Sequence, residues 1–197
     1  MEFSHIKNSQ LLHPSICAKR LYSDKLEQAV HAESCGYQGV SIPEHHLVNI
    51  LLMPSPLQFA VKVAAHTERI EIATSVCQLP LRDMRIFAGE VIQAQTLCNG
   101  RLVLGVGKGA FEYETDRMGV TFETTKPKFE ESLQVLEALL WENEVSWDSE
   151  HYHFEPLTVM PRPEDPIPIA LAIMAPGGIE AMACLLYTSP SPRDQLQ

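Results

Sequence analysis

The feature that most constrains the fold is a unit of one amphipathic helix followed by one short apolar strand. This unit occurs three times in the first half of the chain, with helices predicted over 22–35, 57–65 and 83–98 and strands predicted over 37–43, 70–76 and 101–106. Helices between successive strands predict a parallel sheet, because each parallel crossover needs a long connection. Periodicity alone does not distinguish an open doubly wound sheet from a closed barrel.

Local signals mark the ends of these segments. Gly36 and the pair Asn99-Gly100 are typical helix stops, and Asp83 is a typical helix cap. Ser55-Pro56 combines a cap with proline at the first helical position. These signals place Glu44-His45-His46 directly after the first strand of the repeat.

The second half of the chain continues the pattern less regularly. A fourth helix is predicted over 126–141, with Phe129, Leu133, Leu136, Leu139 and Leu140 on one face. Residues 145–153 predict a small hairpin, 160–168 a proline-rich loop and 167–172 a further strand.

Length and composition predict one ordinary globular domain. Apolar residues make up 45% of the 197 residues and charged residues 20%. An eight-stranded (β/α) barrel usually needs roughly 250 residues, so this chain is short for one.

The overall charge and the lack of long apolar runs exclude several functions. A formal net charge of -10 opposes binding to nucleic acid. No apolar run approaches the ~20 residues that span a bilayer, and the N-terminus lacks a secretory signal, so we expect a cytoplasmic enzyme that does not bind membranes. The five cysteines are widely spaced, which predicts mostly buried small hydrophobic residues and neither a disulfide framework nor a zinc site.

Polar and glycine residues follow the predicted strands, where the ligands of parallel sheets usually bind. His45 and His46 titrate near neutral pH and are candidates for proton transfer, although one of them can equally be a packing residue. No further ligands at metal spacing accompany them, so no metal site is predicted. Gly105, Gly107 and Gly109, with Lys108, are either a phosphate cradle or a tight turn without a ligand.

Four stretches in register resemble the luciferase-like flavin monooxygenases. They are GYQGVSIPEHH, IEIATSVCQLPLRDMRIFAGE, CNGRLVLGVGKGAFEYE and PIPIALAIMAPGGIEAMA. The resemblance implies an α/β fold of the (β/α) TIM-type barrel class, truncated after about five strands. On this basis residues 1–183 are a partial luciferase-like barrel domain, and 184–197 are a disordered tail or sequence foreign to the domain.

The resemblance also implies a chemistry. Such enzymes receive reduced FMN from a separate flavin reductase and use oxygen to oxidise a small organic substrate such as an aldehyde or an alkane. They form homodimers or heterodimers when complete. His45 matches the family's proton-transfer residue, flanked by Glu44 and His46, so these three are the predicted catalytic residues.

The same resemblance implies the cofactor-binding residues: Thr74, Ser75, Val76, Gly107, Lys108, Gly109, Met174, Ala175 and Gly178. Related proteins often have a non-prolyl cis peptide at the segment that Thr74, Ser75 and Val76 match. Lys108 stands where relatives commonly carry arginine, and Met174 and Ala175 stand where they carry hydroxyl groups. A deazaflavin-dependent oxidoreductase and a non-catalytic flavin-binding relative therefore remain alternatives. An incomplete barrel has unpaired strand edges, so we expect this chain alone to be poorly stable and inactive.

Overall fold

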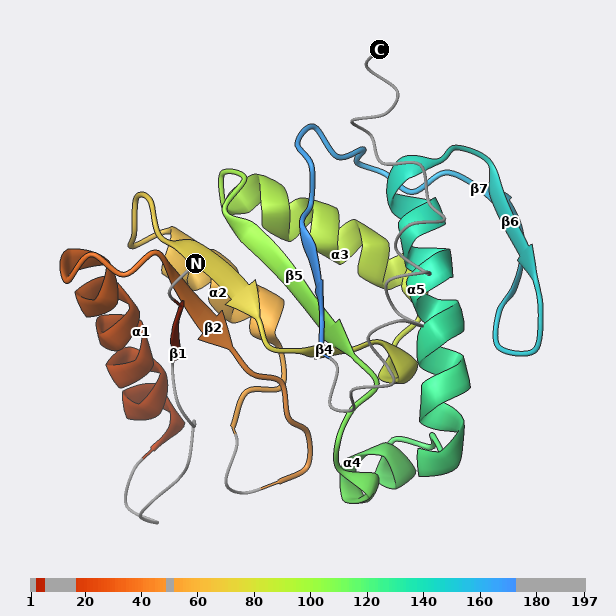
Figure 1. Ribbon diagram of the computed structural model, residues 1–197, viewed down its shortest axis with the longest axis horizontal. Coiled ribbons are helices and arrows are strands. Elements are labelled where there is room, and N and C mark those ends of the chain that lie inside the picture. The colour runs from red at the N-terminus through yellow and green to blue at the C-terminus, as the bar shows by residue number, and fades with distance from the viewer. Residues whose placement is uncertain (1–2, 6–16, 49–51, 173–197) are drawn as a thin grey trace.

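The computed structural model describes residues 3–5, 17–48 and 52–172 of the chain (Figure 1). The strands in chain order are β1 (Phe3–His5), β2 (Gly39–Ile42), β3 (Glu71–Thr74), β4 (Cys77–Gln78), β5 (Leu102–Gly107), β6 (Val145–Asp148), β7 (His153–Leu157) and β8 (Ile169–Leu171). The α-helices are α1 (Ala18–Ser34), α2 (Pro56–Ala64), α3 (Met84–Leu97), α4 (Glu112–Arg117) and α5 (Thr125–Trp141). Two 3₁₀ turns, η1 (Leu79–Leu81) and η2 (Phe122–Thr124), precede α3 and α5.

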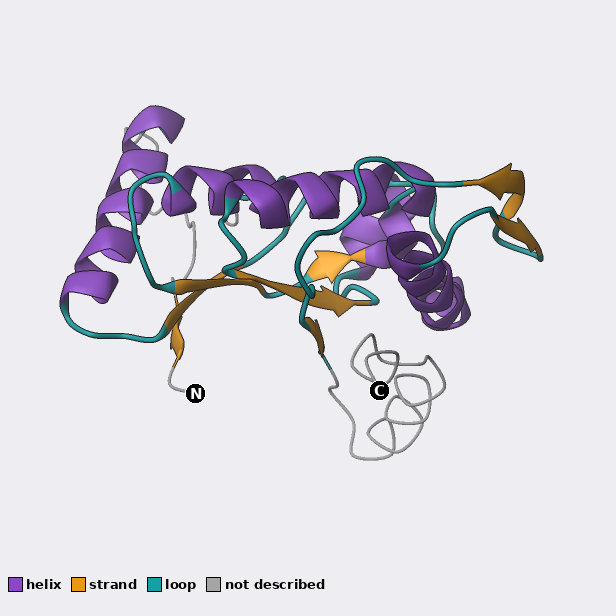
Figure 2. Ribbon diagram, turned by 90° about the horizontal axis from the view of Figure 1, so that it is seen from above, coloured by secondary structure: helices purple, strands orange, loops and turns teal. Residues whose placement is uncertain are grey.

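The main sheet is parallel, and β1, β2, β3 and β5 lie side by side in chain order. β1 pairs with β2, β2 with β3 and β3 with β5, while β4 and β8 also pair with β5. Helices α1, α2 and α3 connect these strands and all lie on one face of the sheet (Figure 2). A doubly wound sheet would have helices on both faces. Sequential parallel strands with helices on one face are the arrangement of a partial (β/α) barrel, which confirms the predicted fold class.

The predicted helices and strands agree with the observed ones, except that some ends differ and the shortest elements were not predicted. β2, β3 and β8 lie within their predicted ranges, and β5 runs one residue further, to Gly107. Helix α1 begins at Ala18, four residues before the predicted start. The second hairpin strand begins at His153, where the predicted hairpin ends, because Ser149 to Tyr152 form the turn. Strands β1 and β4 and helix α4 were not predicted.

The core lies between the sheet and the helices. The five apolar residues predicted on one face of α5 are all buried. They pack with α3, which lies beside α5 in Figure 1 and buries Phe87 and Val91. The sheet contributes the fully buried Ile72, Leu102 and Leu104. Of the cysteines, Cys77 and Cys98 are buried as predicted, but Cys17 and Cys35 flank the two ends of α1 and are exposed, so the prediction is wrong for them.

Two charged side chains hold the amino-terminal ends of the strands. The Arg101 guanidinium donates to the carbonyl oxygens of Ala64, Thr67, Ile70 and Cys98 and to the Thr67 hydroxyl, at 2.9–3.3 Å. It therefore ties the end of α2 to the end of α3, just before β5 starts. The Glu33 carboxylate accepts hydrogen bonds from the backbone N–H groups of residues 68, 69 and 70 at 2.8–3.1 Å. These contacts leave the opposite ends of the strands available for chemistry.

Candidate active site

The predicted catalytic residues lie directly after β2, at the carboxyl ends of the strands. Pro43 ends the strand, and the backbone N–H of His45 then donates to the Met53 carbonyl at 3.0 Å. This bond fixes the segment against the chain leading into α2. Glu44 is 2% exposed, whereas the two histidines are partly exposed. The segment therefore combines one buried acid with two rings near the surface.

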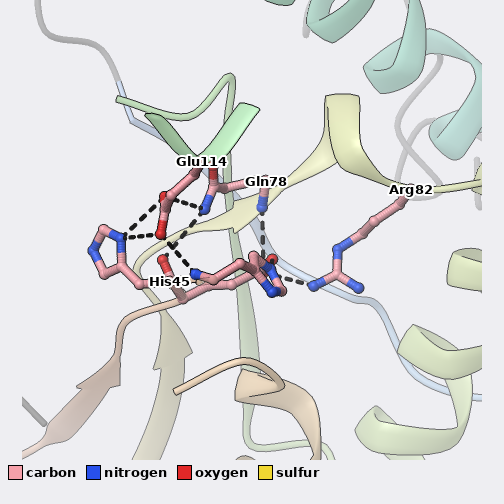
Figure 3. Close-up of polar contacts among 6 residues, drawn as sticks. His45, Gln78, Arg82 and Glu114 are labelled. Atoms are coloured by element: carbon pink, nitrogen blue, oxygen red, sulfur yellow. Dashed lines mark hydrogen bonds and ion pairs between the residues drawn. The ribbon is translucent and has the colours of Figure 1, made fainter. Parts of the chain in front are cut away.

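His45 pairs with a carboxylate that the sequence did not single out (Figure 3). Its Nδ1 lies 3.1 Å from Oε1 and 3.3 Å from Oε2 of Glu114, a fully buried residue of α4. A carboxylate only accepts hydrogen bonds, so the proton of the neutral ring lies on Nδ1 and Nε2 keeps its lone pair. No described residue bonds Nε2. The ring also packs on Phe111, with the ring centroids 5.1 Å apart.

His46 pairs with Glu44 and faces a different set of partners. Its Nε2 lies 2.6 Å from Glu44 Oε1, and the other oxygen of Glu44 accepts from Arg82 Nη2, also at 2.6 Å. The guanidinium of Arg82 stacks over the Phe87 ring at 4.7 Å. Glu44 thus lies between Arg82, which is a cation, and His46, which can become one. This arrangement suits the group to holding the segment in place more than to transferring a proton.

Gln78, the last residue of β4, connects the two pairs (Figure 3). Its side-chain amide donates to Glu114 Oε2 at 3.3 Å and to the Glu44 carbonyl at 3.4 Å, while its backbone N–H donates to Glu44 Oε2 at 3.3 Å. The backbone N–H of His46 donates to Glu114 Oε1 at 2.6 Å. Each buried carboxylate thus has several donors, without which its desolvation would cost several kcal/mol.

The buried charges of this network act on their neighbours. Burial, reinforced by the negative charge of Glu44, raises the pKa of the Cys77 thiol to about 12. Cys77 therefore stays protonated at neutral pH and is not a nucleophile. Burial by itself would lower the pKa of Arg82, but the adjacent Glu44 carboxylate raises it above its ordinary value. Arg82 is a permanent cation next to the Glu44 carboxylate that also bonds His46.

The predicted cofactor residues Thr74, Ser75 and Val76 link β3 to β4. The peptide bond between Ser75 and Val76 is cis, as the family resemblance implies. The Thr74 hydroxyl donates to the Gly105 carbonyl at 2.7 Å and so is used within the sheet. The Ser75 hydroxyl is buried and has no hydrogen-bond partner among the described residues. It is a polar group for which a ligand would provide a partner.

The three glycines of the predicted phosphate cradle lie opposite this segment, at alternate positions. A Cβ on Gly105 would lie 1.9 Å from the Thr74 carbonyl oxygen, and one on Gly107 would lie 2.7 Å from Val76 Cγ2. A Cβ on Gly109, where φ is +88°, would lie 2.5 Å from Gln78 Oε1. The missing side chains therefore make room for neighbouring protein atoms. We call Gly105, Gly107 and Gly109 the glycine stripe.

The remaining cofactor predictions have different outcomes. The ammonium group of Lys108, predicted to meet a phosphate, lies 4.6 Å from the centre of the Phe122 ring. Met174, Ala175 and Gly178, like the predicted tail over 184–197, lie outside the described residues. In the described ranges no group of three His, Cys, Asp or Glu side chains can hold a metal ion, and no helix is long and apolar enough to cross a membrane.

Sequence reasoning missed three residues of the site: Gln78, Arg82 and Glu114. All three lie inside the stretches that carry the family resemblance. The available signal was their position shortly after strands whose carboxyl ends meet at one edge of the sheet. Nothing local shows which polar residue of such a stretch turns inward.

Comparison with known proteins agrees with the family resemblance of the sequence. The family model of the luciferase-like monooxygenases matches residues 3–187. The F420-dependent glucose-6-phosphate dehydrogenase of Kineococcus radiotolerans is 35% identical over 76% of this chain and 46% of its own length. The oxygenase component of the flavin-dependent trigonelline monooxygenase of Acinetobacter baylyi is 25% identical over 83% of this chain and 46% of its own. The chain thus spans less than half the length of these curated relatives.

A solved structure agrees with the fold. The crystal structure of the monooxygenase RslO1 from Streptomyces bottropensis superposes with a TM-score of 0.85 at 24% identity, over 93% of this chain and 57% of that one. The site described above therefore lies on a known fold, and the family match covers nearly all of the chain. On this evidence, the chain belongs to the luciferase-like monooxygenase family.

Proposed function

We propose that this chain is the amino-terminal part of a flavin-dependent monooxygenase that uses reduced FMN and oxygen to oxidise a small organic substrate. The observation that carries the proposal is the pairing of His45 with the buried Glu114. The pair lies at the carboxyl ends of the strands, where the ligands of (β/α) barrels bind. A histidine held in this way can accept a proton and return it, as an oxidation using molecular oxygen requires.

The residues present fit a flavin in two respects. The buried Ser75 hydroxyl needs a hydrogen-bond partner, and the polar groups of an isoalloxazine ring can supply one. Lys108 follows β5 and has no carboxylate partner among the described residues, so it remains available to a phosphate. Thr74, Val76, Gly107 and Gly109 shape the same edge of the sheet. Bound reduced FMN would supply the reaction with oxygen.

The protein's own contribution is to orient groups and to move one proton. Glu114 holds the proton of His45 on Nδ1 and turns Nε2 outward, and it offsets the positive charge that forms when Nε2 takes up a proton. Glu44, tied to Arg82 and to His46, holds the segment that carries His45. In this proposal His45 is the catalytic residue, and Glu44 and His46 position it.

The proposal extends to partners. The trigonelline enzyme is named as an oxygenase component, which favours a separate flavin reductase as the source of reduced FMN. The complete protein would be cytoplasmic and dimeric, with an aldehyde, an alkane or a similar small molecule as substrate. The identity of 35% to an F420-dependent dehydrogenase favours one second candidate: a deazaflavin-dependent oxidoreductase that transfers hydride without oxygen.

Anaerobic melting curves distinguish the two candidates. The chain is melted alone, with reduced FMN and with reduced F420. A ligand at 100 times its Kd stabilises the folded state by ~2.7 kcal/mol, which corresponds to roughly 5–11 °C for a chain of this size. A shift with reduced FMN alone supports the proposal, and a shift with F420 alone replaces it with the second candidate. No shift with either contradicts both.

The role of His45 is tested separately by NMR on protein with 15N-labelled histidine. We expect the ring proton on Nδ1 in the wild type and its transfer to Nε2 in Glu114→Ala, which removes the acceptor. His45→Gln should bind reduced FMN with nearly unchanged affinity but slow the reoxidation of the bound flavin by about 10²-fold. If His45→Gln reoxidises at the wild-type rate, His45 is not the proton-transfer group.

A further inference from the structure

A cavity lies beside the candidate active site and shares Arg82 with it. It has a volume of about 480 Å³, within the usual range for small-molecule sites, and is formed by four stretches of chain: 80–85, 118–120, residue 128 and 151–154. These stretches belong to the turn η1 and the start of α3, the end of α4, helix α5 and the β6–β7 hairpin. Figure 1 shows that the hairpin runs alongside α5.

The walls of this cavity are positively charged in a strongly acidic protein. Arg82, Arg85 and Lys128 line it, against Asp83 as the one carboxylate among its lining residues, and His151 adds an ionisable ring. Because Glu44 pairs with Arg82 and Asp83 with Arg85, the excess is one positive charge, that of Lys128, whereas the whole chain carries -10. Such a local reversal of sign concentrates anions at the cavity.

Lys128 differs from the two arginines because no counterion lies beside it in the part of the chain that the structure describes. Arg82 is paired with Glu44 at 2.6 Å and Arg85 with Asp83 at 2.5 Å. Within the described ranges, no carboxylate lies at ion-pair distance from the Lys128 ammonium. Burial lowers the pKa of Lys128, which means that its charge is partly removed from water without compensation. An anion in the cavity would supply the missing partner.

A smaller part of the lining is apolar. Leu81, Met118, Val120 and Phe154 contribute apolar atoms to the wall, and Tyr152 adds an aromatic ring. The Tyr152 hydroxyl bonds Ser132 at 2.6 Å and is therefore already satisfied. An occupant that carries one anionic group on a small organic body would match this lining.

We propose that this cavity binds a small organic anion, with Lys128 as the counterion of its carboxylate or phosphate group. The site is separate from the His45–Glu114 pair but shares Arg82 with the network around Glu44. Its occupant can therefore be the substrate's acidic end or an effector. Binding of the anion does not require the flavin. An experiment that contradicts this site therefore leaves the proposed function untouched, and the reverse also holds.

The test uses 2-naphthoate and its neutral match 2-naphthamide, titrated into the chain without flavin and followed by NMR. Lys128→Met removes the charge and keeps the length of the side chain. Lys126→Met makes the same change two residues earlier on α5, where the lysine is exposed, paired with Glu130 at 3.7 Å and outside the cavity. Lys128→Arg keeps the charge. The thermal melting of each variant is measured first to confirm that it folds.

We expect saturable binding of 2-naphthoate, weakened about tenfold by Lys128→Met and about twofold or less by Lys126→Met and Lys128→Arg, since one charge-assisted bond is lost only in the first. Rising salt should weaken the binding, because the cavity is open to solvent. Equal affinity for the neutral amide, equal effects of the two methionine variants, or no saturable binding of 2-naphthoate would each overturn the proposal.

Discussion

Substituting Gly105 by alanine should strongly destabilise the protein. The new Cβ would lie 1.9 Å from the Thr74 carbonyl oxygen, a distance that real Cβ atoms, which stay beyond 3.0 Å, do not reach. The obstacle is backbone and cannot rotate away, so β3 and β5 must separate by more than 1 Å. The separation also breaks the 2.7 Å bond from the Thr74 hydroxyl to the Gly105 carbonyl. Overpacking of ~1–3 kcal/mol and a lost bond of ~1 kcal/mol together predict a loss of about 2–4 kcal/mol.

Thermal unfolding followed by circular dichroism measures this loss. About 2–4 kcal/mol corresponds to a fall in Tm of roughly 4–16 °C for a chain of this length. Gly107→Ala should cost less, because its Cβ meets a side-chain methyl of Val76 that can move. Gly89→Ala is the matched control: it lies inside α3, its nearest neighbour is 3.8 Å away, and alanine favours the helix by up to ~1 kcal/mol. If Gly105→Ala melts within a degree of the wild type, the close contact of the two strands is refuted.

Two further predictions concern the amino-terminal ends of the strands. Burial would raise the pKa of Glu33, but the backbone N–H groups that donate to its carboxylate hold the pKa below its usual 4.5. The ionised carboxylate therefore stabilises the fold above pH 4.5, and this stabilisation is lost as the pH falls through the lower pKa of the folded state. Glu33→Gln should cost about 1 kcal/mol at pH 7 and nothing at pH 2, measured by urea unfolding; an equal difference at both pH values would contradict this account. Arg101→Lys should lower the free energy of unfolding by about 2 kcal/mol in the same assay, because an ammonium group cannot reach the five oxygens that the guanidinium bonds. A variant as stable as the wild type would show that those bonds contribute nothing.

The fold was largely predictable because its signals are local. Each long helix has a buried face at helical spacing, and each main strand from β2 onward is a short apolar run between a glycine or polar turn and the next polar cluster. The two-residue strand β4 is too short to show a period. Helix α4, with the sequence EYETDR, has no apolar stripe, and its buried Glu114 contacts His45 across 69 residues of chain.

The candidate site was predictable only in part. The position of His45 at a strand end follows from the pattern, but its partner Glu114 lies 69 residues further along the chain. Arg82 and Gln78 are likewise 38 and 34 residues from Glu44. A sequence pattern shows that such segments converge at one edge of a sheet, but not which of their side chains turn toward one another.

The glycine stripe illustrates a second limit. A glycine in a sequence shows that space is needed beside the backbone, but it does not show what occupies that space. Beside β5 the occupants are Thr74, Val76 and Gln78, so part of the signal for a phosphate site arises from the packing of two strands. The same holds for the positive cavity, whose lining comes from four parts of the chain that no sequence window contains together.

The Arg101 and Glu33 contacts hold one rim of the sheet almost entirely through backbone groups, while the opposite rim is built from side chains. Exchanging the loops after β2 and β5 for those of relatives would therefore replace the reactive groups without touching the anchor that sets the spacing of the strands. Such loop chimeras offer a direct way to transfer a new specificity onto this scaffold.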